Sequence, residues 1–261
     1  MAKVIVGSGF VAQSPGAGGV FSVVLQYLLG LLCAEADLLL DLCASVRPPD
    51  LLAAVRRTAF LDLWQDGMSG VEAPFSTVSQ WWGYPTTVYA GETYDGSKRT
   101  EFLRMLDLPA LTGEPFELGL DLTAMGDGPD RQLLREKNWR VVDAHQVAGD
   151  FAAYRRYIHR ARAEFSVAKP GYVKTCSGWF SDRSACYLAA GRPVLVQETG
   201  FGAVLPTGRG VLSFPTVEEA VQGVAAIRQH YPMHCRAAQE IAREYFAAEK
   251  VLGQLLTEAG V

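Results

Sequence analysis

Short apolar runs alternate with amphipathic stretches along most of the chain, which is the pattern of parallel strands joined by helices. Near the beginning, residues 4–6 predict a strand, residues 20–32 a helix with one apolar face, and residues 38–40 a second strand. Later strands are expected at 59–64, 75–80, 116–122, 139–143, 165–168, 193–197 and 210–214. Later helices are expected at 51–57, 97–106, 131–138, 149–163, 181–190 and 216–229, before a last amphipathic helix that carries Ile241, Tyr245, Leu252, Leu255 and Leu256. The fold class expected from this order is α/β, with parallel sheets and right-handed crossovers.

A group of chain-breaking residues divides this pattern into two parts. Three Gly and Ser residues and then Pro74 fall within residues 65–74, which we interpret as a linker. The sequence therefore predicts a short N-terminal domain over residues 1–70 and a larger C-terminal domain over residues 71–261.

Composition and charge narrow the class of protein. The chain has 261 residues, of which 49% are hydrophobic and 20% charged, and this excludes disordered, collagen-like and coiled-coil proteins. The net charge of −4 would repel nucleic acid and anionic membranes, so neither is expected as a partner. The most apolar window, residues 20–34, is too short to span a bilayer. Five cysteines without a C-x-x-C pair, and no signal peptide, favour a reduced cytoplasmic protein.

A glycine-rich loop follows the first expected strand. Gly7, Gly9 and Ala12 have the spacing of a dinucleotide-binding turn, but the loop continues to Gly18 and Gly19 before the helix begins. Three interpretations stay open: a dinucleotide site, a loop that faces another ligand, and a purely structural loop. No phosphate-binding P-loop and no nucleophile elbow occur in the sequence.

Positive charge is concentrated in one stretch of this acidic chain. Residues 151–192 contain eight basic side chains and only two acidic ones, so this stretch carries +6 and the remainder −10. Such a patch suits a small polyanion such as a nucleoside diphosphate. Lys169 and Arg183 are the favoured ligands, because they fall in a loop or at a helix start, whereas the arginines of 155–162 are expected on a solvated helix face.

The helix start at residues 181–184 has two interpretations. Ser181 or Asp182 would cap the helix, and in the functional interpretation the helix N-terminus and Arg183 also hold phosphate oxygens. His230 and His234 have the i, i+4 spacing of metal ligands, but Pro232 between them disrupts a regular helix and no carboxylate cluster completes a site. No metal site is therefore expected.

Several segments of the C-terminal half resemble a known family. The runs FSVAKPGYV (165–173), SGWFSDRSACYLAAGRPV (177–194) and QETGF (197–201), continued at 205–212 and 218–220, are similar to the nucleotide-sugar half of GT-B glycosyltransferases. The similarity is to a bacterial group labelled glycosyltransferase family 1 or glycosyltransferase-like, and the N-terminal Gly18-Gly19 loop and helix continue it. The resemblance implies two Rossmann-like domains that face each other across a cleft, with the activated sugar held mainly by the second.

The resemblance also implies a set of donor-binding residues. The glycine loop would approach the donor, the Lys98-Arg99 pair would neutralise the diphosphate, the helix start would meet the donor, and the segment 198–200 would line the sugar or ribose pocket. With Lys169, the expected donor-binding residues are Gly18, Gly19, Lys98, Arg99, Lys169, Ser181, Asp182, Arg183, Ser184, Glu198, Thr199 and Gly200. The expected activity is metal-independent transfer of a sugar, of hexosyltransferase type, from a nucleotide-diphosphate donor to an unknown small-molecule or glycan acceptor, with no cofactor.

Two departures from the family leave alternatives open. Only about 70 residues precede the linker, so the acceptor domain is truncated and would be completed by a partner, such as a second copy in a homodimer, or be lost. The E-x7-E pair of one retaining group is replaced by Gly178 and Cys186. The catalytic residues stay unassigned: an inverting reaction would need a carboxylate base from Asp41, Asp50, Asp62 or Glu72, whereas a retaining reaction asks less of a base. A non-catalytic nucleotide-sugar-binding or partner protein is the alternative, and a nicotinamide-dependent oxidoreductase is a third possibility.

Overall fold

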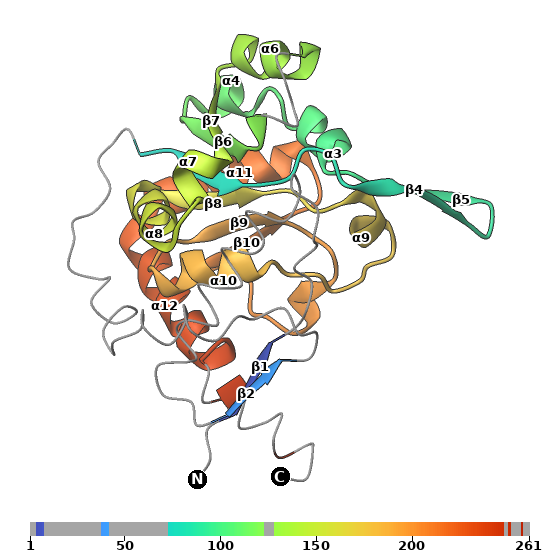
Figure 1. Ribbon diagram of the computed structural model, residues 1–261. Helices are drawn as coiled ribbons and strands as arrows, with labels where there is room; N and C mark the ends of the chain where they lie inside the picture. The colour runs from blue at the N-terminus through green and yellow to red at the C-terminus, as the bar shows by residue number, and fades with distance from the viewer. Residues whose placement is uncertain are drawn as a thin grey trace.

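The computed structural model describes residues 4–7, 38–41, 73–122, 128–247, 250–251 and 257, and its main body is a parallel sheet with helices on both faces (Figure 1). The strands of this sheet lie in the order β10-β9-β8-β3-β6-β7, and every neighbouring pair is parallel. Their bounds are β3 (Phe75–Val78), β6 (Phe116–Leu120), β7 (Trp139–Asp143), β8 (Ala163–Ser166), β9 (Val194–Gln197) and β10 (Val211–Phe214). This is the doubly wound order of a Rossmann-like domain, and it confirms the α/β class.

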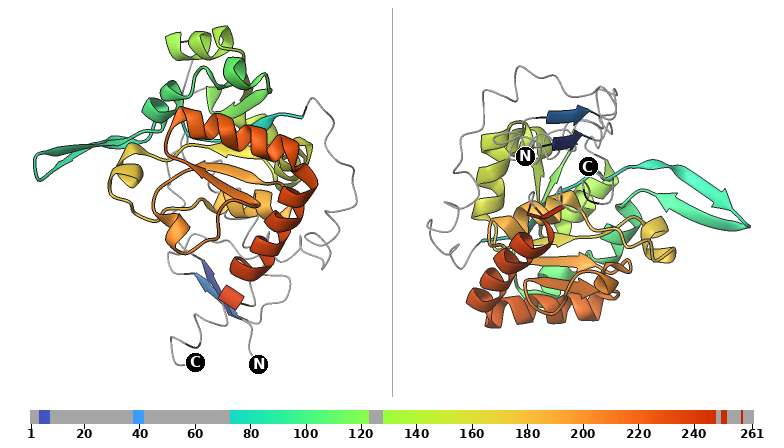
Figure 2. Two further views of the ribbon diagram at one scale, coloured as in Figure 1. Left: turned by 180° about the vertical axis from the view of Figure 1, so that it is seen from behind. Right: turned by 90° about the horizontal axis from the view of Figure 1, so that it is seen from below.

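The helices of this body form one layer on each side of the sheet (Figure 2). One layer contains α7 (Ala144–Ala148), α8 (Phe151–Arg160), α10 (Asp182–Ala189) and α12 (Tyr231–Tyr245). The other contains α3 (Arg99–Arg104), α4 (Leu108–Thr112), α6 (Pro129–Glu136) and α11 (Val217–Gln229). Two short helices, α9 (Pro170–Lys174) and η2 (Phe201–Ala203), lie in the loops after β8 and β9.

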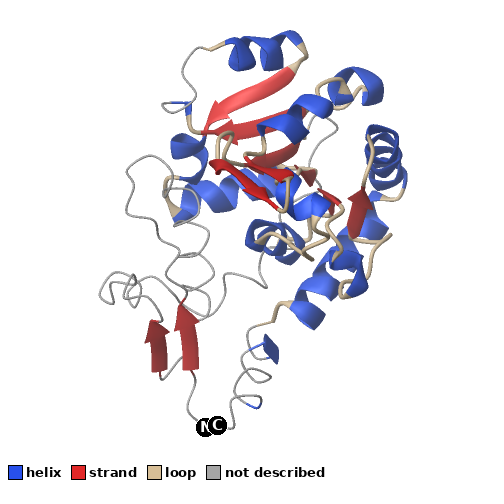
Figure 3. Cartoon of the chain, turned by 90° about the vertical axis from the view of Figure 1, so that its right-hand side faces the viewer, coloured by secondary structure: helices blue, strands red, loops and turns tan. Residues whose placement is uncertain are grey.

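Burial on both faces explains why the sequence pattern located these strands. In β9, Val194 and Val196 pack into the core beneath one helix layer, whereas Leu195 between them packs into the core beneath the other. A strand covered on both faces must be apolar at consecutive positions, which is the run that the sequence shows. The side view in Figure 3 shows helices on both sides of the strands.

A two-stranded antiparallel hairpin projects from this body between β3 and α3 (Figure 1). It consists of β4 (Tyr84–Tyr89) and β5 (Glu92–Gly96), and its turn is made by Ala90 and Gly91, which both have positive φ. This hairpin was not predicted from the sequence. Its strands bury little, so the apolar periodicity that located the other strands is absent here.

The structure corrects the expected pattern around β8 and at Pro232. The helix expected over 149–163 is α8, which ends at Arg160, and β8 begins at Ala163 instead of residue 165. A separate short helix, α7, precedes it over Ala144–Ala148 and was not predicted. Asp143 and Asp150 cap these two helices, each accepting a hydrogen bond from a backbone N–H in the first turn, and this explains why each helix begins where it does. Pro232 does not disrupt a helix, because it stands in the first turn of α12, where its missing N–H costs nothing.

The N-terminal part is described only at two strands. β1 (Val4–Gly7) and β2 (Leu38–Asp41) form a parallel pair, as the sequence predicted. The domain division at residue 70 and the elements expected at 20–32, 51–57 and 59–64 lie outside the described residues. No helix in the described part of the chain combines the length and the apolar character that a membrane span needs.

Candidate functional site

The strand order places a crevice at the carboxyl edge of the sheet. β3 and β8 are neighbours, yet the chain leaves β3 towards β6 and leaves β8 towards β9, on opposite sides. Loops that diverge from adjacent parallel strands leave an opening between them, and ligands of doubly wound sheets bind there. The charged residues that the sequence analysis selected after β8 and β9 belong to this edge.

Lys98 is a buried basic residue close to this edge. It precedes the first residue of α3, only 7% of its surface is exposed, and its Nζ lies 4.9 Å from the centre of the Trp179 ring. Burial lowers the pKa of Lys98 well below its usual range; Arg183 and Lys169 lower it further, against the opposing effects of Glu164 and Asp182. Within the described residues, no carboxylate forms an ion pair with this ammonium.

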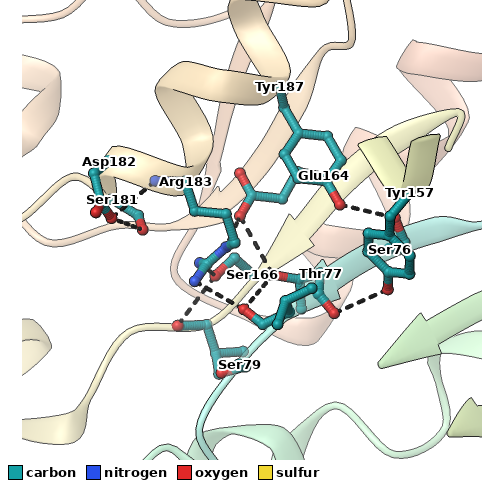
Figure 4. A network of polar contacts seen from close by, with 12 residues as sticks. Ser76, Thr77, Ser79, Tyr157, Glu164, Ser166, Ser181, Asp182, Arg183 and Tyr187 are labelled. Carbon is teal, nitrogen blue, oxygen red and sulfur yellow. Dashed lines mark hydrogen bonds and ion pairs between the residues drawn. The ribbon is translucent and has the colours of Figure 1, made fainter. Parts of the chain in front are cut away.

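Arg183 is buried and is held by residues at the ends of two strands of the sheet (Figure 4). Its Nε donates to Oε1 of Glu164 at 2.6 Å, its Nη2 to Oγ of Ser166 at 2.6 Å, and its Nη1 to the carbonyl oxygen of Val78 at 3.0 Å. The structure therefore connects α10 with the ends of β8 and β3 through one guanidinium. Burial would lower the pKa of Arg183, but the charge and hydrogen bond of Glu164 raise it above its usual range.

This ion pair belongs to a buried polar network. Thr77 donates to the same oxygen of Glu164 at 3.4 Å, the hydroxyls of Ser76 and Tyr187 are 2.9 Å apart, and Tyr157 donates to the carbonyl of Thr77 at 3.1 Å (Figure 4). Glu164 is completely buried, and its second carboxylate oxygen has no hydrogen-bond partner in the described structure. The contacts of Arg183 therefore hold the start of α10 against the sheet, which is a structural role.

The residues at the start of α10 are placed as the sequence predicted, but their hydrogen bonds differ. Ser181 stands at the cap position, yet its hydroxyl donates to Asp182 Oδ1 instead of accepting a bond from the first turn. The carboxylate of Asp182 accepts the backbone N–H of Arg183 at 2.9 Å. Ser184 is buried, and its hydroxyl has no partner among the described residues.

An aromatic pair joins Lys98 to α9 and to the loop that precedes α10. The rings of Trp179 and Tyr172 stack with centroids 5.4 Å apart, and Lys169 lies 5.9 Å from the centre of the Tyr172 ring. Lys169 is partly buried just before α9, and this burial lowers the pKa of its amine. One region of the edge is therefore surrounded by Lys98, Lys169 and the first turn of α10. The charges of Lys169 and Asp182 both act on the pKa of Lys98, which agrees with this arrangement.

The segment after β9 is tied to the same aromatic residue. Glu198 Oε1 accepts the backbone N–H groups of Thr199 at 3.0 Å and Gly200 at 2.6 Å. Thr199 donates its hydroxyl to the carbonyl oxygen of Trp179 at 2.6 Å, and Gly178 donates its N–H to the carbonyl of Thr199 at 2.7 Å. The expected donor-binding residues 198–200 thus lie against the loop that precedes α10.

Arg99 is the expected ligand that the structure places elsewhere. Its guanidinium forms a two-point ion pair with Asp130, with Nε–Oδ2 and Nη2–Oδ1 distances of 2.6 and 2.7 Å, and Trp81 Nε1 donates to the same carboxylate at 2.9 Å. The hydrogen bond from Arg99 is the main cause of a pKa of Asp130 below its usual value. Arg99 lines a separate hollow of about 350 Å³ together with Trp82, Gly83, Thr86, Asp95, Ser97 and Thr100.

The N-terminal part of the expected site falls outside the described residues. Gly18 and Gly19 are not described, and neither are Asp50, Asp62 and Glu72, which were candidate bases; Asp41 ends β2. In the described part of the chain, no three His, Cys, Asp or Glu side chains are grouped as a metal site would require. His234 is instead buried, and its Nδ1 accepts the backbone N–H of Gly210 at 3.3 Å.

Two residues of the site were missed at the sequence level. Trp179 contacts Lys98, Tyr172 and Thr199, and Glu164 holds Arg183. Glu164 did carry a signal, because a carboxylate inside an apolar strand is rarely buried without a cationic partner. Comparison with protein-family models finds no match, and comparison with curated proteins finds no significant relative.

Proposed function

We propose that the chain is a glycosyltransferase that moves a sugar from a nucleotide-diphosphate donor to an acceptor hydroxyl. The observation that carries this proposal is Lys98, a buried lysine at the carboxyl edge of a doubly wound sheet, with no carboxylate paired to it in the described structure. A buried charge is costly unless a counter-ion reaches it, and the diphosphate of a donor is such an ion. The resemblance of segments 165–201 to nucleotide-sugar-binding domains supports the same ligand.

The neighbouring groups supply what a donor would need. Lys169 and the first turn of α10 lie beside Lys98, so they would share the charge of the diphosphate. Glu198 Oε1 is occupied by two backbone N–H groups, which orients the carboxylate so that its other oxygen can accept from a sugar or ribose hydroxyl. Arg183 would act indirectly, since its bonds to Glu164 and Ser166 position the helix start.

The proposed reaction needs stabilisation of a departing anion. The acceptor oxygen forms a bond to the anomeric carbon, and the bond from that carbon to the diphosphate oxygen breaks. The diphosphate leaves with the electron pair, and the acceptor hydroxyl gives its proton to a base that stays unassigned. Fixed cations beside the leaving group stabilise this charge as it develops, so Lys98 and Lys169 would take the role that a metal ion has in other transferases.

The full proposal includes a GT-B arrangement, with a shortened N-terminal Rossmann-like domain opposite the domain described here. The parallel pair β1–β2 is compatible with such a sheet. The alternative is a protein that binds a nucleotide-sugar without transferring it.

Isothermal titration of the whole chain with UDP, GDP, TDP and NAD in metal-free buffer tests the proposal. We expect one nucleoside diphosphate to bind, and Lys98→Met to weaken that binding at least tenfold. Lys137→Met is the matched control, because Lys137 is an exposed lysine paired with Asp107 on another part of the surface. Release of sugar from the matching donor would distinguish an enzyme from a binding protein. Binding of NAD alone, or of no nucleotide, would refute the proposal.

A further inference from the structure

Two cations and two carboxylates face the amine of Lys98, so its surroundings carry no excess of negative charge to balance an ammonium. From α10 it faces Arg183 and Asp182, from β8 it faces Glu164, and from the loop after β8 it faces Lys169. Glu164 is itself bonded to Arg183 at 2.6 Å. The face of the Trp179 ring lies 4.9 Å from Nζ and contributes no formal charge.

The charged groups of the Lys98 segment are directed to other partners. Arg99 is bound by Asp130, and Glu101 accepts from Gln197 at 2.7 Å and pairs with Arg104. Asp95 accepts hydrogen bonds from Ser97 and Thr100; burial raises its pKa, but these bonds outweigh burial and lower it overall. No carboxylate on this segment therefore compensates the ammonium.

A phosphate anion bound beside Lys98 would favour the protonated form of its amine. Without an anion, burial of the amine disfavours its protonated form; the two neighbouring cations add to this effect, and Glu164 and Asp182 oppose it. An anion bound between Lys98 and Lys169 places two negative oxygens beside the amine, and opposite charge at that distance favours protonation. The protonation state of the amine and the occupancy of the site are then linked, since whatever favours one favours the other.

We propose that Lys98 takes up a proton when a phosphate anion binds beside it, so that the site binds phosphate-bearing ligands in a proton-linked manner and releases them as pH rises. In this step, the Nζ lone pair accepts a proton from the solvent buffer, and the resulting ammonium donates to the phosphate oxygens. The inference rests on the proposed function only for the nucleotide part of the ligand; the proton linkage concerns the phosphates alone.

The titration of Lys98 can be followed directly by NMR of protein labelled with ¹³C at the lysine ε-carbon, with the Lys98 resonance assigned by its absence in Lys98→Arg. We expect its midpoint to lie below the ordinary lysine value of about 10.4. Saturating inorganic pyrophosphate should raise it by about one pH unit. The Lys169→Met variant should also raise it, because Lys169 is one of the cations that face Lys98. An ordinary midpoint, or one that pyrophosphate does not move, would overturn the inference.

Calorimetry gives a second measurement that separates this inference from the proposed function. Pyrophosphate is titrated at pH 7 to 9.5 in buffers of different ionisation enthalpy, and the number of protons taken up is compared between the wild-type protein and Lys98→Arg. The ligand's own ionisation is the same for both proteins, and arginine stays charged throughout this range, so the difference reports Lys98. We expect extra proton uptake in the wild type and an affinity that falls by up to about tenfold per pH unit relative to the variant.

The two proposals fail in different ways. If pyrophosphate binds with proton uptake but no nucleoside diphosphate binds more tightly, the proton-linked site stands and the glycosyltransferase proposal fails. If a nucleoside diphosphate binds with the same pH dependence in the wild type and in Lys98→Arg, the donor site stands and the proton linkage is wrong. If pyrophosphate does not bind at any pH in this range, the anion site itself is refuted.

Discussion

Nε of Arg183 lies 2.6 Å from Oε1 of Glu164, so the guanidinium that the sequence offers as a phosphate ligand is already bound inside the protein. The two residues are 19 positions apart in the sequence: Glu164 is in the central strand β8, and Arg183 is in the first turn of α10. The pair fixes the start of α10, while no carboxylate among the described residues forms an ion pair with the neighbouring Lys98.

Removal of Arg183 should destabilise the protein severely. Arg183→Met leaves the completely buried carboxylate of Glu164 uncompensated, and such a change costs about 3–5 kcal/mol of the free energy of unfolding. Urea denaturation measures this loss. The double variant Glu164→Gln with Arg183→Met should lose less than Arg183→Met alone, whereas Arg243→Met on the exposed side of α12 should stay within about 0.5 kcal/mol of wild type. A small loss in Arg183→Met would contradict the structural role of the pair.

The substitution Lys98→Met should abolish anion binding and, separately, make the protein more stable. The pKa of Lys98 is lower in the folded chain than in the unfolded chain, so the unfolded chain binds the proton more tightly at neutral pH. The wild type should therefore gain stability as pH rises towards about 10.4, and the variant should lack this gain. At pH 7 we expect Lys98→Met to add about 0.5–2 kcal/mol, measured by urea denaturation. A less stable variant would show that Lys98 is a structural residue.

Substitutions that break the Arg99–Asp130 pair should lower the stability of the protein without changing its affinity for pyrophosphate. Arg99→Met and Asp130→Asn each break the two-point pair, and because Arg99 is about one third exposed the expected loss is about 1 kcal/mol at pH 7. The pKa of Asp130 is lowered by this pair, so its contribution is present above about pH 4 and is lost as pH falls through the folded pKa. Thermal unfolding at pH 3 and pH 7 measures this difference. A tenfold loss of pyrophosphate affinity in Arg99→Met would contradict this prediction and show that Arg99 takes part in anion binding.

Two glycines with positive φ provide a matched test of the packing of α12. Gly208 and Gly210 have φ of +93° and +73°, so alanine at either position strains the backbone. A Cβ at Gly210 would also lie 2.5 Å from the backbone nitrogen of Ala238, whereas a Cβ at Gly208 meets nothing within 4 Å. Gly208→Ala should cost about 1 kcal/mol and Gly210→Ala distinctly more, as measured by the change in Tm. Equal losses would mean that the backbone of α12 moves to accommodate the methyl group.

The strands and helices of the C-terminal half were largely predictable because their causes are local. The apolar run 193–197 predicts β9, and the capping sequence at Thr216 predicts α11, where Thr216 accepts the N–H of Glu219 at 3.3 Å. The hairpin of β4 and β5 was not predictable in the same way. Its strands are mostly exposed, so no burial pattern marks them in the sequence.

The sequence by itself determined the α/β class, most element positions and the clustering of basic residues between 151 and 192, because periodicity and local charge can be counted along the chain. The tertiary structure decided which of those charges are neutralised. Lys98 and Arg183 are 85 positions apart, and their roles differ because folding brings Glu164 into contact with one and an aromatic ring over the other. The free energy of a buried charge depends on distance and desolvation, and neither is set by spacing along the chain.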